Sequence, residues 1–71
     1  MTESIHISLA AARVNAGLTQ EEVAKIMHVS KATIVSWENE SSEPKVSQAF
    51  KLSALYNLPM DCIFFYQEKP R

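Results

Sequence analysis

Two short amphipathic segments, separated by only a few residues, place the strongest constraint on the fold of this chain. They lie between Leu18 and Asn39, in the stretch LTQEEVAKIMHVSKATIVSWEN. The first segment opens with a capping box, in which the Thr19 hydroxyl accepts from the amide of Glu22 and the Glu22 carboxylate accepts from the amide of Thr19. This pattern predicts a short helix that begins at Gln20.

The predicted helix carries one narrow apolar stripe, made of Val23, Ala24 and Met27. A stripe of this kind has to pack against another part of the chain. The helical periodicity breaks after Met27, and Ser30 then supplies an N-cap for a second helix. The sequence therefore predicts two consecutive helices joined by a tight turn.

In the second helix, Ile34 and Trp37 form the inward pair. A helix of about nine residues is marginal on its own, so the first helix must hold it at the steep angle that suits a turn of about three to four residues. Held out from the body in this way, the second helix fits a DNA major groove, which is about 12 Å wide. The side chains left on its outward face are Lys31, Ala32, Val35, Ser36 and Asn39.

Three further helices and no strand are expected in the rest of the chain. The first covers residues 4–16 and ends at Gly17, a residue suited to a helix C-terminus. Another begins at Pro44 and ends at residues 57–59, and a short last helix covers residues 60–64. The predicted fold class is therefore all-α, a compact five-helix bundle. The apolar face expected on the fourth helix consists of Val46, Ala49, Phe50, Leu52 and Tyr56.

The length and composition of the chain exclude several classes of protein. A chain of 71 residues forms one domain, because it buries only about 60% of its unfolded surface. We expect the domain to cover residues 1–66, followed by a short tail at residues 67–71. The single Cys excludes an intramolecular disulfide. No apolar run approaches the ~20 residues that span a bilayer, and residues 1–13 lack the pattern of a signal peptide. A soluble, cytoplasmic protein without a membrane partner is expected.

Residues that bind metals or catalyse reactions do not form a recognisable site. His6, His28 and Cys62 do not pair at a ligand spacing. No nucleophile with a neighbouring base can be named. We therefore predict no metal, no cofactor and no enzymatic activity, and we interpret Cys62 as a small packing residue.

The charge balance argues against simple electrostatic attraction to a nucleic acid. Seven basic residues stand against eight acidic ones, which gives a net charge of −1 and lacks the basic excess expected of a DNA-binding domain. Lys31 lies on the outward face of the second helix and Lys45 follows that helix, but Glu40 and Glu43 follow it too. We expect weak binding by a monomer and a dependence on dimerisation.

The order and spacing of common residues resemble the XRE/Cro type of helix-turn-helix family, which includes the lambdoid phage repressors and Cro proteins. The resemblance covers roughly residues 9–64. It implies a lambda repressor-like fold and an ion pair between Arg13 and Glu38, whose loss would lower thermal stability. The matching positions are Arg13, Gly17, Leu18, Thr19, Gln20, Glu22, Ala24, Val29, Ser30, Ile34, Trp37, Glu38, Asn39, Pro44 and Asp61.

Two residues depart from the family pattern. His28 stands in the turn where Gly is usual, and a left-handed conformation there would cost roughly 1–2 kcal/mol. Glu40 replaces the Gly that usually follows the Trp-Glu-Asn segment, so we expect Asn39 to take the left-handed C-cap position.

The resemblance also implies which residues contact DNA. Gln20 would donate to a phosphate, Lys31 would donate to guanine O6 and N7, and Ala32 would meet a thymine methyl group. Ser36 reads a base edge with little selectivity of its own. The predicted DNA-binding residues are Thr19, Gln20, Ser30, Lys31, Ala32, Thr33, Val35, Ser36, Asn39, Ser41 and Lys45.

The aromatic run near the C-terminus suggests self-association. Phe64, Phe65 and Tyr66 cannot all be buried in a monomer of this size, so we expect them to form a homodimer interface. The predicted function is a small transcriptional repressor, of prophage or Cro-like type, that binds a palindromic operator in double-stranded DNA. The alternative is a protein-interaction module or an antitoxin, whose partner would be a protein co-regulator or a toxin.

Overall fold

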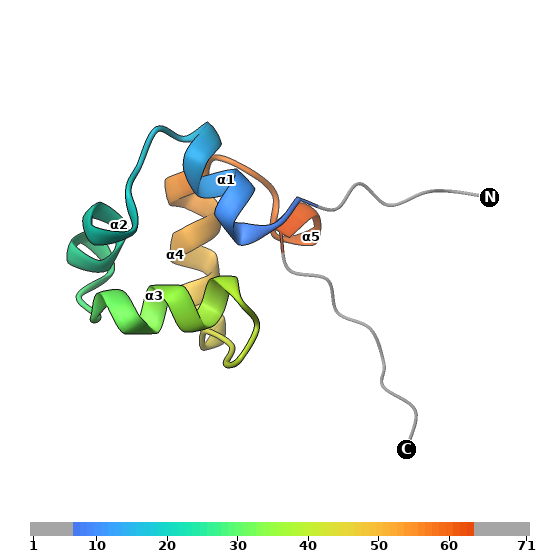
Figure 1. Ribbon diagram of the computed structural model, residues 1–71. Helices are drawn as coiled ribbons and strands as arrows, with labels where there is room; N and C mark the ends of the chain where they lie inside the picture. Colours follow the sequence, from blue (N-terminus) through green and yellow to red (C-terminus); the bar gives the residue numbers. More distant parts are fainter. Residues whose placement is uncertain (1–6, 64–71) are drawn as a thin grey trace, which may run out of the picture.

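The computed structural model describes residues 7–63, which contain five helices and no strand. The helices are α1 (Leu9–Asn15), α2 (Gln20–Met27), α3 (Lys31–Glu38), α4 (Val46–Tyr56) and α5 (Met60–Ile63) (Figure 1). Helix α3 crosses the lower side of the molecule in this view, α2 lies above its start, and α4 rises behind the other helices. The predicted all-α fold with five helices is therefore confirmed.

Helix α1 begins later than the sequence predicted. Ser8 has an extended backbone (φ −68°, ψ 156°), and its side chain accepts from the amide of Ala11 at 3.0 Å, so Ser8 is the N-cap. A prediction that began the helix at residue 4 is wrong for Ile7 and Ser8, and residues 4–6 lie outside the described part of the chain. The helix ends at Asn15 with Ala16 as its C-cap, and not at Gly17. Gly17 follows the cap with a φ of +77°, a conformation that suits a residue without a side chain.

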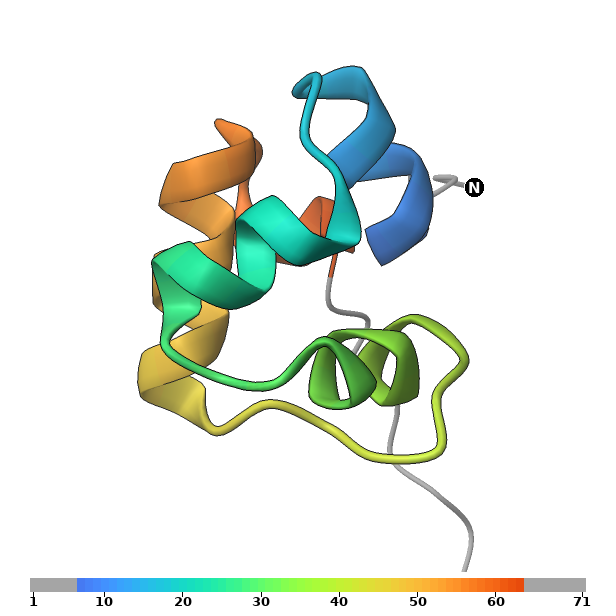
Figure 2. The same cartoon turned by 60° about the vertical axis from the view of Figure 1, so that its left-hand side comes forward.

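Local capping explains the limits of α2 and α3. The amide of Thr19 donates to Glu22 Oε1 at 2.8 Å and the amide of Glu22 donates to Thr19 Oγ1 at 3.1 Å, which completes the predicted capping box. His28 adopts the left-handed conformation (φ 59°, ψ 44°) and ends α2. Ser30 then caps α3 by accepting from the amide of Thr33 at 3.2 Å. Figure 2 shows the resulting tight turn, with the two helices crossing steeply.

All five helices contribute to a single hydrophobic core. The predicted inward pair of α3 is buried, with Ile34 1% and Trp37 6% exposed. Ile63 of α5 closes the core, and the backbone amide of Ile7 donates to the carbonyl of Cys62 at 2.8 Å, which fixes the start of the described chain beside α5. The residues of this core are Ala12, Val23, Ala24, Met27, Ile34, Trp37, Leu52, Tyr56 and Ile63.

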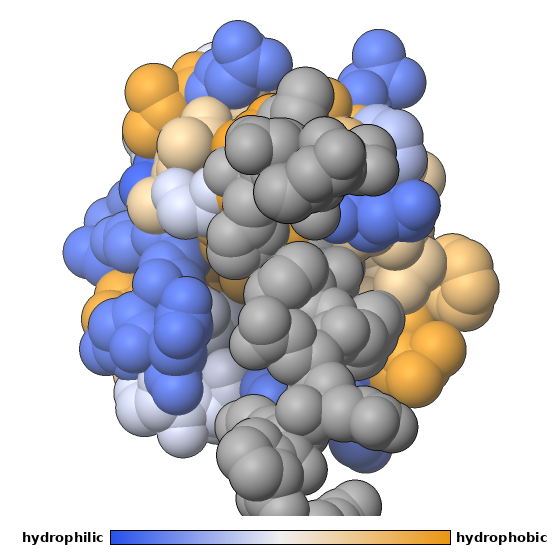
Figure 3. All heavy atoms as spheres, turned by 90° about the vertical axis from the view of Figure 1, so that its right-hand side faces the viewer, coloured by the Kyte–Doolittle hydropathy of each residue, from blue (hydrophilic) through white to orange (hydrophobic). Residues whose placement is uncertain are grey.

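The buried face of α4 is narrower than the sequence predicted. Ala49, Leu52 and Tyr56 are buried, but Val46 is 64% and Phe50 61% exposed. The prediction was wrong for Val46 and Phe50, which lie roughly a quarter and a third of a turn away from the buried stripe at 3.6 residues per turn. The space-filling view shows a group of apolar side chains at the lower right of the molecule and hydrophilic side chains over much of the lower left (Figure 3).

Candidate nucleic-acid interface

Helix α3 presents a solvent-exposed side that is the candidate interface. Lys31, Ala32 and Val35 are exposed, and Thr33 and Ser36 are partly exposed. We call these five residues the outer face of α3. Because Ile34 and Trp37 fill the core from the opposite side of the helix, the outer face cannot rotate away from solvent without emptying the core.

The C-terminal end of α3 is anchored to α1 by an ion pair. Arg13 Nε donates to Glu38 Oε2 at 2.7 Å, and Arg13 Nη2 lies 3.4 Å from Glu38 Oε1. The side chains are 15% and 9% exposed. The hydrogen bond to Glu38 raises the pKa of the Arg13 guanidinium above its ordinary value. Arg13 Nη1 also donates to the carbonyl of Leu18 at 2.9 Å, which ties the α1–α2 turn to the same group.

The amide of Gln20 binds the same carboxylate. Gln20 Nε2 donates to Glu38 Oε1 at 3.0 Å, so the first residue of α2 is joined to the last residue of α3. A primary amide has two N–H donors, and one of them remains available for another acceptor. The sequence interpretation did not include this contact, because residues 18 positions apart show no local pattern that would reveal it.

Lys31 is paired with an acidic residue of α2. Its Nζ lies 2.9 Å from Oε2 of Glu21, and the two side chains are 52% and 65% exposed. The hydrogen bond from Lys31 lowers the pKa of the Glu21 carboxyl. Glu21 also lies in the first turn of α2, where the helix macrodipole favours a negative charge. Its contact with Lys31 was not predicted from the sequence.

The loop after α3 turns at Glu40 and not at Asn39. Asn39 has a φ of −96°, whereas Glu40 has a φ of +66°, so the expectation of a left-handed Asn39 is wrong. Asn39 Oδ1 accepts from the amide of Ser41 at 3.0 Å, and this local bond suits a right-handed residue followed by a reversal. The amides of Ser41 and Ser42 both donate to the carbonyl of Ser36, at 3.0 and 3.3 Å.

Hydroxyl groups near the outer face of α3 are engaged within the protein. Ser36 Oγ and Ser42 Oγ are hydrogen-bonded to each other, and Ser30 Oγ lies 3.0 Å from Thr33 Oγ1. Each hydroxyl retains lone pairs or a rotatable proton for a second partner. To contact a base or a phosphate, the Ser36 hydroxyl must form a second hydrogen bond while it stays bonded to Ser42, or must leave Ser42.

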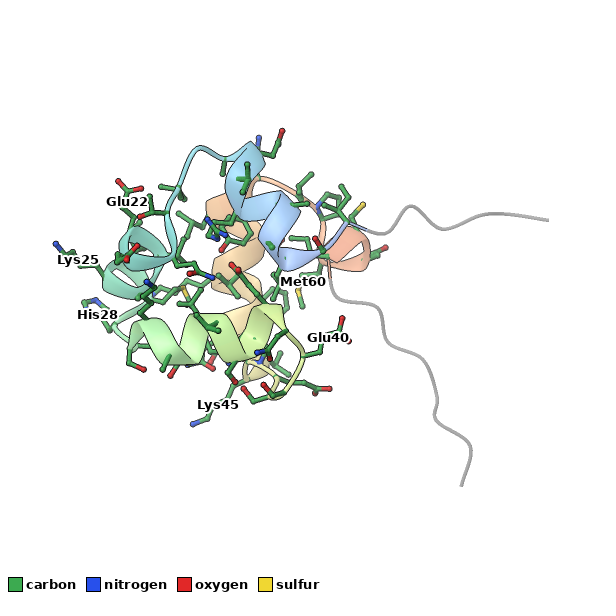
Figure 4. The ribbon with its side chains drawn as sticks, viewed as in Figure 1. Glu22, Lys25, His28, Glu40, Lys45 and Met60 are labelled. Carbon is green, nitrogen blue, oxygen red and sulfur yellow. The ribbon has the colours of Figure 1, made fainter. Side chains whose placement is uncertain are left out.

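Lys45 lies at the far end of the same loop. Its side chain projects into solvent, while Glu40 projects from another part of the loop (Figure 4). The backbone amide of Lys45 donates to Gln48 Oε1 at 2.8 Å and so begins α4. Glu43, also exposed, lies between them in the sequence. The loop therefore offers one basic side chain against two acidic ones.

The predicted DNA-binding residues fall into two groups, which are joined by the hydrogen bond between Ser36 and Ser42. One group comprises the N-termini of α2 and α3 with the outer face of α3, and the other is the loop from Asn39 to Lys45. The predicted dimer residues Phe64, Phe65 and Tyr66 lie outside the described residues. Within residues 7–63 no cluster of His, Cys, Asp or Glu could hold a metal ion, and no helix is long and apolar enough to cross a membrane.

Comparison with known proteins identifies the family. The sequence model of the family described as Helix-turn-helix matches residues 9–61. A protein of Methanocaldococcus jannaschii named an uncharacterized HTH-type transcriptional regulator is 35% identical over 51 residues, covering 72% of this chain and 77% of that protein. A protein of Archaeoglobus fulgidus with the same description is 33% identical over 57 residues, 80% of each chain. No solved structure matches the chain at a significant level. The chain thus belongs to the XRE-type helix-turn-helix family of DNA-binding transcriptional regulators.

Proposed function

We propose that this protein is a sequence-specific repressor of prophage or Cro-like type that reads an operator with the outer face of α3. The observation that carries the proposal is the burial of Ile34 and Trp37, which holds Lys31, Ala32 and Val35 together on the exposed side of a helix supported by α2. A DNA major groove accepts a helix presented in this way.

Each predicted contact has a physical role in this proposal. The free N–H of Gln20 donates to a phosphate at the N-terminus of α2, where the helix dipole favours negative charge. Lys31 donates to guanine, and Ala32, Thr33 and Val35 meet thymine methyl groups. Thr19, Ser30, Ser36, Asn39, Ser41 and Lys45 contribute contacts to the backbone or to neighbouring base edges.

Binding by a homodimer completes the proposal. Two copies associated through Phe64, Phe65 and Tyr66 would present two α3 helices to successive major grooves of a palindromic operator, about 34 Å apart. Doubling the contacts offsets the shortage of positive charge on one copy. Repression would act by occupation of a promoter, in the cytoplasm and without enzymatic activity.

Selection of random duplex DNA by the pure protein, at low and moderate salt, tests this function. We expect a palindromic consensus that relaxes at one position when Lys31→Ala is used. The logarithm of the binding constant should fall with the logarithm of salt concentration, with a slope of about −0.9 per phosphate contacted. Failure to enrich any sequence, by the protein at either salt concentration, would overturn the proposal.

A second candidate function is a protein-interaction module, for example an antitoxin. Three exposed acidic residues near the outer face of α3, namely Glu21, Glu40 and Glu43, favour it, because they repel phosphates. A protein partner would remain bound at moderate salt, whereas DNA binding weakens steeply. An antitoxin would also have a cognate toxin, which an adjacent reading frame and co-purification would reveal.

A further inference from the structure

The contact between Glu21 and Lys31 joins the two helices of the helix-turn-helix on the side proposed to face DNA. Glu21 lies in the first turn of α2, and Lys31 is the first residue of α3. Their charged atoms are 2.9 Å apart, and both side chains are more than half exposed. The core does not require this contact, so its consequences are electrostatic.

The ion pair between Lys31 and Glu21 offsets the positive charge on the outer face of α3. Lys31 is the one basic residue among the five that form the face, and Arg13, the other basic residue in an ion pair within residues 7–63, is bound to Glu38. Glu21 holds the ammonium group by a hydrogen bond as well as by charge, and the same bond lowers the pKa of Glu21. The carboxylate therefore stays ionised and remains a partner for Lys31 at neutral pH.

We propose that Glu21 is a specificity-determining residue, which restrains Lys31 and so weakens binding to DNA of arbitrary sequence. This inference rests on the proposed DNA-binding function. An unpaired lysine attracts phosphates, which are present at every position of any duplex and carry no sequence information. A lysine held by Glu21 must give up or share that bond before it contacts a phosphate.

A guanine within reach of Lys31 can be bound without loss of the contact between Lys31 and Glu21. An ammonium group has three N–H donors, so Lys31 can keep its bond to Glu21 and still donate to O6 or N7 of guanine. The bond to Glu21 therefore weakens those phosphate contacts that require the ammonium group to leave Glu21. It does not weaken a contact with guanine that Lys31 can make while it stays bound to Glu21. Glu21 acts through Lys31 and is a positioning residue in this sense.

The size of the effect is limited by exposure to solvent. Exposed ion pairs are weak, and their loss changes an equilibrium by about two- to five-fold. Salt screens interactions of this kind, so the effect should be largest at low ionic strength. A measurement of binding to arbitrary sequence at low salt is therefore the most sensitive test.

A comparison of four proteins distinguishes the restraint of Lys31 by Glu21 from a general effect of net charge on DNA binding. They are the unmodified chain, Glu21→Gln, Lys31→Met and the double variant. Binding is measured on a random-sequence duplex and on the duplex selected by the unmodified protein. We expect Glu21→Gln to raise affinity for the random duplex about two- to five-fold, and to raise affinity for the selected duplex less, so that the ratio between them falls.

The effect of Glu21→Gln in proteins with and without Lys31 shows whether Glu21 acts through Lys31. If Glu21 acts by restraining Lys31, its replacement by Gln raises affinity more when Lys31 is present than in the Lys31→Met background. Equal gains in both backgrounds would mean that Glu21 only repels phosphates, and the inference would be overturned. Glu43→Gln is the matched control, because it removes the same charge from an exposed residue outside this pair, and its gain should be the same in both backgrounds.

Two further outcomes remain distinguishable. If no variant binds either duplex, the proposed function fails and the inference fails with it. If the unmodified protein binds and Glu21→Gln leaves the ratio between the two duplexes unchanged, only the inference fails. Thermal melting of all four proteins establishes that each is folded under the conditions of the binding experiment.

Discussion

Arg13 Nε lies 2.7 Å from Oε2 of Glu38, and this contact joins the first helix to the end of α3. It is the longest-range side-chain hydrogen bond in the described chain, with 25 positions between its partners. The outer face of α3 is thus held in place by a polar contact at one end as well as by Ile34 and Trp37 in the core.

Replacement of Arg13 by Ala should lower stability. The substitution strands the Glu38 carboxylate, whose side chain is 9% exposed. We expect a loss of about 2–3 kcal/mol, less than for a fully buried pair because Arg13 keeps some contact with water. Thermal melting followed by circular dichroism measures the change. An unchanged melting temperature would refute a stabilising role for the pair.

Replacement of Glu40 by Gly should raise stability. Glu40 has a φ of +66°, a conformation that costs a residue with a side chain about 1–2 kcal/mol. Glycine avoids that cost but loses more entropy on folding, so a net gain of about 0.5–1 kcal/mol is expected in urea unfolding. Glu43→Gly is the control, because Glu43 is exposed in the same loop without a positive φ. It should not stabilise the protein, and an equal gain would contradict the explanation.

Removal of the Thr19 hydroxyl should weaken the start of α2. Thr19→Ala deletes the acceptor for the amide of Glu22, and the expected cost is about 1 kcal/mol in the free energy of unfolding. Thr19→Ser keeps the hydroxyl and should retain most of the stability. If both variants lose the same amount, the methyl group of Thr19 matters and the cap does not.

Stability should fall at high pH through Tyr56. Burial, assisted by the charge of Glu38, raises the pKa of the Tyr56 hydroxyl from 10.0 to about 12. The folded state therefore keeps the proton that the unfolded state loses first. This contribution is complete below pH 10 and is lost as the pH rises through about 12.

Tyr56→Phe isolates that contribution from the titration of other groups. The free energy of unfolding of the unmodified protein should fall between pH 10 and about 12 more steeply than that of the variant. After allowance for screening by solvent, the difference should reach about 1–2 kcal/mol. If the free energy of unfolding changes with pH in the same way in both proteins, Tyr56 has the same pKa in the folded and unfolded states.

The parts of the fold that could be predicted from sequence depend on local contacts. Thr19 and Ser30 mark the starts of α2 and α3 because a capping side chain bonds to an amide three residues away. The start of α1 was not predicted in this way, because the helix was expected to begin at residue 4 and Ser8 was not identified as the N-cap. At the end of α3, the left-handed residue is Glu40, and the amide of Ser41 bonds to the side chain of Asn39, which was not predicted from the sequence.

Contacts between helices could be predicted only where the family resemblance supplied them. It paired Arg13 with Glu38, but the bonds from Gln20 to Glu38 and from Lys31 to Glu21 depend on how α2 and α3 cross. The exposure of Val46 and Phe50 has a similar origin, because the neighbours of α4 determine how much of its surface is covered.

The Glu38 carboxylate, which binds both Arg13 and Gln20, should be a frequent site of loss-of-function mutations. It accepts from Arg13 and from Gln20, so one side chain links the stability of α1 to the orientation of the residue proposed to grip the DNA backbone. A genetic screen for loss of the proposed repression should therefore recover Glu38 substitutions as often as substitutions on the outer face of α3. Such mutants would look like defects in operator recognition, although the altered side chain is turned into the protein.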